Sequence, residues 1–546
     1  MNFTILGITL ITILGAVLRI IGIDKDGGLW NDEYVSWSIA AIPFGKGFIK
    51  GIFSQCHMPL YYLYLKFFNF ISSNDTFLRF SSVIPGVAAI PIMYITGKEK
   101  SKLTGFMCAL FAALSSFLIY YSQEVRFYSL LFLFSALSLY FTIRTVRKPR
   151  KKNLIGLIIS NFLILFTHTI GFVYVFFDLL FITYKLKKLY KKFVKYAWLS
   201  TVIILIAVSP LLIKILFLSN TMSQWWNNLN IYRILQPICD YFTPIIFGVS
   251  TIENIHGLNV NSVFLIVPAL IALIVLIAGT VDKNLRYNNQ IIIIASCVFF
   301  VALFAAATGK LAINSKYIIE IYPILIFIFC STVDSYNKTW FKILIFTVFF
   351  AFQIGYIFSP YYAPFLPREE GNKYVADLIK SANLNKNDFI VLTYYPKKRF
   401  TKYFDFSDYN VVEIYKGNFN YYYSPFLTSE EALKFGKNKY RGTFLNSITP
   451  VKDFTGSTLV DRLNNEVYFK MHPNQKVAFL FFDSVSFLDE YMFAAIITNP
   501  NNYKRAALPY LVFSNIRNEI IKTLPINARN VRYEVKGAWT IVSFQY

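Results

Sequence analysis

The sequence predicts a polytopic α-helical membrane protein of about eleven transmembrane helices, followed by a C-terminal α/β domain. The first observation is composition: of 546 residues, 55% are hydrophobic, 18% aromatic and only 15% charged, which is typical of a membrane protein. The second is a series of apolar runs through the first 360 residues. The third is a change near residue 365, where charged and turn residues increase and strand-like runs begin.

The apolar runs are candidates for membrane-spanning helices, because about 20 apolar residues cross a bilayer as a helix. The fifth and sixth runs are short and could form one re-entrant hairpin or two helices. We therefore predict a transmembrane domain over residues 1–360, with spans near residues 3–22, 76–97, 103–121, 127–143, 153–168, 170–184, 196–218, 260–281, 290–309, 315–333 and 340–359.

Basic residues gather in the loops on one side of these spans. The positive-inside rule makes that side the cytoplasm, so the N-terminus is expected inside and residues 361–546 outside a cell membrane that the chain crosses many times. The net charge of +24 is explained by loops that meet anionic lipid headgroups, and not by nucleic-acid binding. The loops are Lys98–Lys102, Arg144–Lys152, Lys185–Lys195, Lys283 with Arg286, and Lys338 with Lys342.

The first outer loop, residues 23–75, is expected to lie along the membrane surface. Its segment 58–71 is apolar but short and rich in tyrosine, and a span there would invert every later basic loop. An interfacial helix fits better, since tyrosine favours the headgroup region. A similar helix is expected from Glu33 to Ile42.

The C-terminal domain, residues 361–546, is predicted to be a small α/β unit on the outer face. Strand-like runs alternate with amphipathic stretches, which is typical of an α/β arrangement. No phosphate-binding loop or dinucleotide fingerprint occurs in it. The strands are expected at Phe389–Tyr395, Val411–Tyr415, Val477–Phe482 and Trp539–Phe544, and the helices at Lys373–Ser381 and Pro509–Thr523.

The five cysteines have neither metal-type spacing nor the pattern of a disulfide framework. The N-terminal apolar run lacks a basic segment before it and a small-residue cleavage site, so it is expected to be a retained helix rather than a cleaved signal peptide.

Four polar clusters reach the outer membrane surface under this topology. Asp32 and Glu33 follow the first span, and His57 precedes the interfacial segment. The run Ser122–Tyr128 joins the third and fourth spans, and His168 lies between the fifth and sixth. Carboxylates are costly near lipid, so acids retained there indicate chemistry or ion handling.

Each cluster also has a purely structural interpretation. Asp32 could cap the helix that follows it, Glu124 and Arg126 could be a simple ion pair, and either histidine could be a hydrogen-bonded filler. Four basic side chains are expected near the outer ends of spans: Arg19, Arg126, Lys214 and Lys316. For Arg19 and Lys214, snorkelling of the charged group to the membrane surface is as good an interpretation as a role in the site.

Together, such residues permit group transfer from an anionic donor. One carboxylate can take the proton of an acceptor hydroxyl as general base. A second carboxylate with a histidine can hold a divalent cation against a leaving phosphate, and arginine or lysine can pair with that phosphate.

The four clusters, in this order, resemble the integral-membrane glycosyltransferases of the C superfamily. The nearest resemblance is to bacterial and archaeal relatives of dolichyl-phosphate-mannose–protein mannosyltransferase (family 39) and of the lipid A aminoarabinose transferase. It is clear over residues 10–180 and looser at Lys316-Tyr317 and the outer domain. The motifs are Trp30-Asn31-Asp32-Glu33-Tyr34, His57-Met58-Pro59-Leu60-Tyr61-Tyr62, Ser122 to Tyr128, and Thr167-His168-Thr169-Ile170-Gly171-Phe172.

Three positions differ from the usual family pattern. Met58 stands where a proline is usual, Val125 where an alanine is usual, and Lys316 where an arginine commonly precedes tyrosine. Lysine keeps the positive charge but lacks the bidentate geometry of arginine toward phosphate.

The resemblance implies a polyprenyl-phosphate-linked sugar donor, an acceptor hydroxyl on a lipid, glycan or protein, and transfer on the outer membrane face with inversion. It implies Asp32 as the general base and Glu124 as a second catalytic acid. A divalent metal (Mg, Mn or Zn) would be held by His168 and Glu124. The residues expected to bind substrate are Glu33, His57, Tyr61, Arg126, Tyr128 and Lys316.

Two other functions compete with this interpretation. A transporter or flippase of lipid-linked saccharides would bind at the bilayer midplane, often between repeated halves, whereas these acids lie at one surface and no internal repeat occurs. A polymerase or ligase of surface polysaccharide is chemically close to the predicted transferase.

Overall fold

The computed structural model describes the chain in thirteen stretches, and all structural statements refer to them. They are residues 3–25, 27–54, 57–186, 191–213, 241–242, 262–281, 291–307, 315–358, 371–392, 397–413, 467–482, 528–536 and 539–545. The predicted domain boundary at residue 361, the helix at Pro509–Thr523 and Lys214 lie outside them.

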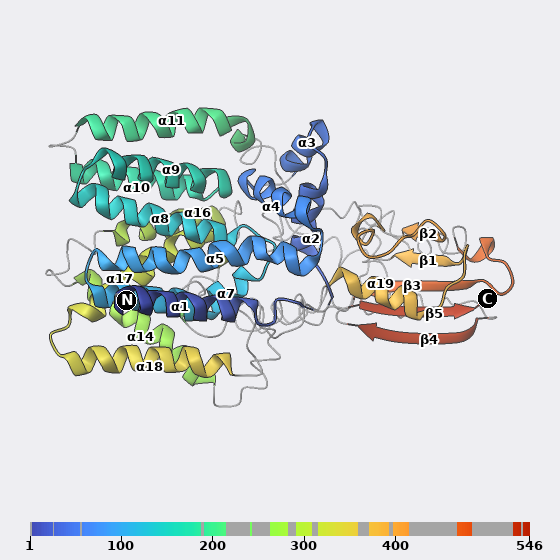
Figure 1. Cartoon of the computed structure of the whole chain (residues 1–546). Helices are drawn as coiled ribbons and strands as arrows, with labels where there is room; N and C mark the ends of the chain where they lie inside the picture. The colour runs from blue at the N-terminus through green and yellow to red at the C-terminus, as the bar shows by residue number, and fades with distance from the viewer. Residues whose placement is uncertain are drawn as a thin grey trace, which may run out of the picture.

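Helices form a bundle at one end of the molecule and a sheet lies at the other (Figure 1). The helices of the bundle are α1 (Phe3–Ile20), α5 (Asp75–Lys98), α6 (Lys102–Leu114), α7 (Ser116–Ser122), α8 (Tyr128–Arg147), α9 (Lys151–Thr167), α10 (Gly171–Leu186), α11 (Lys191–Ile213), α14 (Ser262–Val281), α16 (Ile292–Ala307), the 3₁₀ helix η3 (Ser315–Ile321), α17 (Tyr322–Ser335) and α18 (Thr339–Ile357).

Each predicted span coincides with one of these helices or with a pair that meets at a bend. The short fifth and sixth spans are two separate helices, α9 and α10, rather than a single hairpin segment. Among the described helices, four are long and apolar enough to cross a membrane by strict criteria, and α6 with α7 forms a fifth candidate bent by 54°. Large apolar side chains point outward, as lipid contact requires; Phe3, for example, is 90% exposed and Phe304 is 71% exposed.

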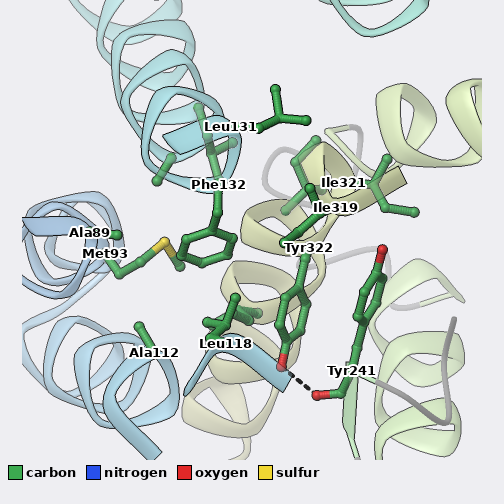
Figure 2. Packing of buried hydrophobic residues seen from close by; sticks show 14 of the residues in the cluster. Ala89, Met93, Ala112, Leu118, Leu131, Phe132, Tyr241, Ile319, Ile321 and Tyr322 are labelled. Carbon is green, nitrogen blue, oxygen red and sulfur yellow. Dashed lines mark hydrogen bonds between the residues drawn. The ribbon is translucent and has the colours of Figure 1, made fainter. Parts of the chain in front are cut away.

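The core of the bundle lies where α5, α6, α7 and α8 meet η3 and α17 (Figure 2). Small side chains, Ala89 of α5 and Ala112 of α6, let neighbouring helices approach closely. The aromatic rings of Phe132 and Tyr322 fill the space between α8 and α17, with centroids 5.8 Å apart. The Tyr322 hydroxyl donates to the carbonyl of Tyr241, so its polar end is satisfied inside the core.

Three short helices lie between the bundle and the sheet: α2 (Asn31–Ala41), α3 (Lys46–Ser54) and α4 (Leu60–Ile71) (Figure 1). Helices α2 and α4 match the two helices predicted in the first outer loop, whereas α3 was not predicted. Trp37 of α2 donates to Asn69 of α4 at 2.9 Å, which ties the two together. These helices form the layer in which the polar clusters meet.

The C-terminal sheet has the strand order β2-β1-β3-β5-β4. Strand β1 is parallel to β2 and β3, whereas β5 is antiparallel to β3 and β4. Helix α19 (Asn372–Ser381) packs its apolar face on the sheet, with Val375, Leu378 and Ile379 buried against it. The strands are β1 (Phe389–Leu392), β2 (Asn410–Glu413), β3 (Lys476–Phe482), β4 (Arg529–Lys536) and β5 (Trp539–Gln545).

The fold-class prediction is therefore confirmed, with one strand missed. Strand β4 lies at the edge of the sheet, and its Val531 and Val535 are each 53% exposed. An edge strand with charged residues lacks the apolar run that marks a buried strand.

Three predicted basic loops are fully described, Lys98–Lys102, Arg144–Lys152, and Lys338 with Lys342, and they lie at the end of the bundle opposite the polar clusters (Figure 1). Lys283, Arg286 and part of Lys185–Lys195 lie outside the described residues. Arg144, at the end of α8, pairs with Glu99, after α5, at 2.7 Å, so two of the basic loops are neighbours. The polar clusters lie at the end that carries α2, α4 and the sheet. Which end faces the cytoplasm stays a prediction from the positive-inside rule.

Candidate active site

Glu33 is the buried centre around which the first outer loop is built. Its carboxylate accepts from Arg79 of α5 at 3.1 and 3.2 Å, and the side chains of both residues are fully buried. It also accepts from the backbone N–H groups of Val125 at 2.9 Å and Trp30 at 3.2 Å. Glu33 thus joins α2, α5 and the linker between α7 and α8. Because its carboxylate is inaccessible, the structure favours a loop-shaping role over direct contact with a substrate.

Asp32, the residue before Glu33, is accessible to solvent whereas Glu33 is buried. Its side chain is 31% exposed, and its Oδ2 lies 3.7 Å from Nη2 of Arg126. It occupies the first turn of α2, where the helix dipole favours a negative charge. Asp32 is therefore an accessible carboxylate with a cationic neighbour, and its accessibility lets it reach the proton of a substrate hydroxyl, as a general base must.

Arg126 connects Asp32 to the first histidine. Its Nη1 contacts the Asp32 carbonyl at 3.4 Å and the Ser36 hydroxyl at 3.2 Å, and its Nη2 lies 3.0 Å from Nε2 of His57. Burial lowers the pKa of His57 well below its usual value, and the positive charge of Arg126 lowers it further. His57 is therefore neutral and accepts the arginine hydrogen bond.

Glu124 lies in the linker between α7 and α8 and is buried. Burial raises its pKa to about 8; Lys316 opposes that shift, and the charges of Glu33 and Asp32 add to it. Glu124 therefore holds a proton at neutral pH. Two neighbouring acids in such different environments are the pattern of paired acid and base groups.

His168, at the end of α9, closes the other side of the cluster. Its ring stacks on Phe127 with centroids 4.9 Å apart and faces His57 at 6.1 Å. Its Nδ1 lies 3.9 Å from Oε1 of Glu320. Sequence reasoning missed Glu320, whose only signal was an acid within the apolar span predicted at residues 315–333. Glu320 is fully buried, and within the described chain neither of its oxygens has a hydrogen-bond partner.

The predicted metal site is not supported by a full ligand set. Among the described residues, no group of three or more His, Cys, Asp or Glu side chains could hold a metal ion. The acid paired with His168 is Glu320, not the predicted Glu124. A catalytic zinc takes three protein ligands, which these residues do not provide. Magnesium needs only one or two carboxylates beside a substrate phosphate, so a magnesium ion stays a prediction and no step is derived through a metal.

The remaining predicted substrate-binding residues line the same layer. Nζ of Lys316 lies 5.9 Å from the Trp30 ring. Tyr61 is buried, with its hydroxyl 3.3 Å from that of Ser81. Tyr128 is fully buried, and its hydroxyl has no hydrogen-bond partner in the part of the chain described. The structure thus brings all eight predicted catalytic and substrate-binding residues, and His168, to one end of the bundle.

Arg19 has a structural role, so its interpretation as a snorkelling side chain is wrong. It is buried, and its guanidinium donates to the carbonyls of Ala112 at 2.7 Å and Ala113 at 3.2 Å and to the Ser122 hydroxyl at 3.1 Å. These bonds fasten α1 to the junction of α6 and α7.

Part of the sequence matches a known protein family, and the fold matches solved structures. The family model described as dolichyl-phosphate-mannose-protein mannosyltransferase matches residues 56–213. This stretch is less than a third of the chain and contains His57, Glu124, Arg126 and His168. No curated protein matches the sequence.

Solved structures match over almost the whole chain. ArnT from Cupriavidus metallidurans in the apo state aligns over 98% of this chain and 97% of its own, with a TM-score of 0.53 and 9% identity. The same protein bound to undecaprenyl phosphate aligns over the same shares, with a TM-score of 0.50 and 10% identity.

The fold is that of a C-superfamily membrane glycosyltransferase. The predicted resemblance to this superfamily is therefore confirmed, both by the family match and by the fold shared with ArnT. The two findings indicate a glycosyltransferase embedded in a membrane. At 9–10% identity, the shared fold does not carry the donor, acceptor or residue roles of ArnT to this chain.

Proposed function

We propose that the protein transfers a sugar from a polyprenyl-phosphate-linked donor to an acceptor hydroxyl, with inversion and with Asp32 as general base. The observation that carries the proposal is the pairing of an accessible carboxylate, Asp32, with the buried cation Arg126, 3.7 Å away, beside the protonated Glu124. The undecaprenyl phosphate bound to ArnT supports a donor of this lipid class.

In the proposed reaction, the Asp32 carboxylate takes the proton of the acceptor hydroxyl as its oxygen attacks the anomeric carbon. The new carbon–oxygen bond forms as the bond from that carbon to the phosphate oxygen breaks, and the electron pair leaves with the polyprenyl phosphate. A single displacement inverts the anomeric configuration. Loss of a general base lowers such rates by about 100- to 10,000-fold.

The leaving phosphate gains negative charge, and the site provides cations to stabilise it. Arg126 is held by Asp32, Ser36 and His57, so its guanidinium is fixed in position before the donor binds. Lys316 lies near Trp30 in the same layer. Preorganised charges of this kind stabilise a transition state without reorganisation during the reaction.

Glu124, which carries a proton at neutral pH, would act as a hydrogen-bond donor to the substrate. Its raised pKa keeps it neutral beside Asp32 and Glu33. The transfer would take place on the outer face, where the positive-inside rule puts this end of the bundle. The divalent cation implied by the resemblance stays a prediction, which activity before and after treatment with EDTA would test.

The test is to incubate membranes containing the protein with a panel of undecaprenyl-phosphate sugars and to measure the undecaprenyl phosphate released. We expect release from at least one donor, with the product glycoside of opposite anomeric configuration to the donor. Release with retained configuration would contradict the single displacement. No release from any donor, in membranes that supply native acceptors, would contradict the proposed class of donor.

A further inference from the structure

The C-terminal domain is hydrogen-bonded to the loop that leads into Asp32. The backbone N–H of Leu29 donates to the Tyr403 hydroxyl at 2.8 Å, and its carbonyl accepts from the Asn372 side chain at 2.8 Å. The backbone N–H of Lys373 donates to the Gly27 carbonyl at 2.8 Å. Both backbone groups of Leu29, three residues before Asp32, are thus bonded to the C-terminal domain.

Glycine at position 371 permits this approach. A Cβ at Gly371 would lie 2.4 Å from the carbonyl oxygen and 2.5 Å from the Cα of Gly27, distances that real side chains essentially never show. Gly27 and Gly28 have φ values of 85° and 71°, a region that favours glycine. The two segments therefore meet backbone to backbone, through glycines on both sides.

Tyr403 also ties the loop to helix α5. Its hydroxyl accepts from Leu29 and donates to the Asp75 carboxylate at 2.9 Å, and Lys402 pairs with the same carboxylate at 3.1 Å. Asp75 begins α5, whose Arg79 holds Glu33 one turn further on. The contacts therefore form a closed ring through the C-terminal domain, α5, Glu33 and the loop.

Helix α2 depends on such external contacts for its position. It has only 11 residues, and the backbone N–H of its N-cap residue Trp30 is bonded to Glu33, the carboxylate that Arg79 of α5 holds. Isolated helices of this length are marginal, so tertiary contacts decide where the first turn lies. Asp32 is in that turn, and the Tyr34 hydroxyl of the same turn donates to the Lys398 carbonyl of the C-terminal domain at 2.5 Å.

We propose that the C-terminal domain is a positioning device for Asp32, acting through Asn372 and Tyr403 on the loop 27–34. We call these contacts of Gly371, Asn372, Lys373, Lys398 and Tyr403 the C-terminal brace. The inference rests on the proposed function in that Asp32 is taken as the base. A displacement of about 1 Å in a catalytic group can cost roughly 100-fold in rate, so the brace matters even though it does not touch substrate.

Two substitutions each remove a side-chain contact of the brace, one at Tyr403 and one at Asn372. Tyr403→Phe keeps the ring and removes the hydroxyl that bridges Leu29 and Asp75. Asn372→Asp keeps the acceptor for Arg399, 3.1 Å away, and removes the side-chain donor to Leu29, leaving the longer backbone bond from residue 372 at 3.3 Å. Tyr409→Phe is the matched control, because Tyr409 packs on Phe404 in the same domain, with centroids 5.4 Å apart, and is no part of the brace.

The experiment measures three quantities in each purified full-length variant: turnover at saturating undecaprenyl-phosphate sugar, binding of undecaprenyl phosphate, and amide hydrogen exchange in peptides covering residues 27–34. We expect both brace variants to lose roughly 10- to 100-fold in turnover. Exchange in 27–34 should be faster, and lipid binding and the thermal midpoint should stay within error of wild type. Tyr409→Phe should change none of these quantities.

Full turnover in both brace variants, or reduced turnover with unchanged exchange in 27–34, would overturn the inference. Asp32→Asn, measured in parallel, separates this failure from failure of the proposed function. If Asp32→Asn abolishes turnover and the brace variants do not lower it, only the inference fails. If Asp32→Asn itself retains turnover, the assignment of the base fails, and the brace has no base to position.

Discussion

The substitution Glu33→Gln tests the central position given to Glu33 in the first outer loop. The carboxylate accepts two bonds from Arg79 and two from backbone N–H groups, and both side chains are fully buried. The amide of glutamine has one acceptor oxygen, and its NH₂ group would face a donor. The substitution therefore leaves a buried arginine without its counter-charge.

Breaking a buried ion pair from one side costs about 3–5 kcal/mol. Arg79 keeps its bonds to the carbonyls of Ile23 at 3.0 Å and Gly28 at 2.8 Å, which compensate in part. The lower end, about 3 kcal/mol, is therefore expected. Scaled from smaller domains, this corresponds to a fall of roughly 5 °C in the thermal midpoint.

The assay is the fraction of monodisperse protein that remains in detergent after heating to a series of temperatures. Glu99→Gln is the control, because Glu99 pairs with Arg144 and Arg147 where all three side chains are partly exposed, and such pairs contribute about 1 kcal/mol or less. The double variant Glu33→Gln with Arg79→Met should recover part of the loss, since it removes the unpaired charge. A thermal midpoint for Glu33→Gln equal to that of Glu99→Gln would refute the reasoning.

Three further predictions follow from the same structure. The pKa of Glu124 is raised from 4.5 to about 8 in the folded state. Its contribution to stability is therefore full below pH 4.5 and is lost as the pH rises to about 8. Unfolding midpoints of Glu124→Gln should therefore fall less than those of wild type between pH 5 and pH 8, and equal slopes would contradict the assignment. Glu320→Gln should raise the thermal midpoint, because it removes a buried carboxylate that accepts no hydrogen bond within the described chain; a lower midpoint would contradict this reasoning. In a variant without native cysteines, an impermeant maleimide added to intact cells should label Ser407→Cys and not Lys151→Cys, and the reverse pattern would invert the topology.

The sequence was sufficient to predict the helices of the bundle and most of the residues that gather at the candidate site. Apolar length and basic loops predicted the spans, because lipid imposes both on any helical membrane protein. The polar residues of the outer loops could be assigned to one site from the sequence, because every second loop of a helix bundle lies at the same end. Strand β4 was missed because an exposed edge strand lacks an apolar run.

Contacts between distant segments could not be predicted. Nothing local separates Asp32, accessible at the surface, from Glu33, buried on Arg79 46 residues away. Arg19 seemed free to reach lipid headgroups until its partners on α6 and α7 were placed beside it. Glu320 was hidden in an apolar run, and its pairing with His168 depends on how η3 packs against the end of α9. The C-terminal brace joins residues more than 340 positions apart in sequence.

The most direct test of the account is the turnover of Asp32→Asn with the donor accepted by the wild-type protein. Asp24→Asn is the matched control, an exposed acid of the same outer loop whose carboxylate accepts from Thr76 at 2.9 Å. We predict that Asp32→Asn lowers turnover at least about 100-fold, with unchanged thermal midpoint and binding of undecaprenyl phosphate, and that Asp24→Asn is as active as wild type. Full turnover in Asp32→Asn would contradict the account.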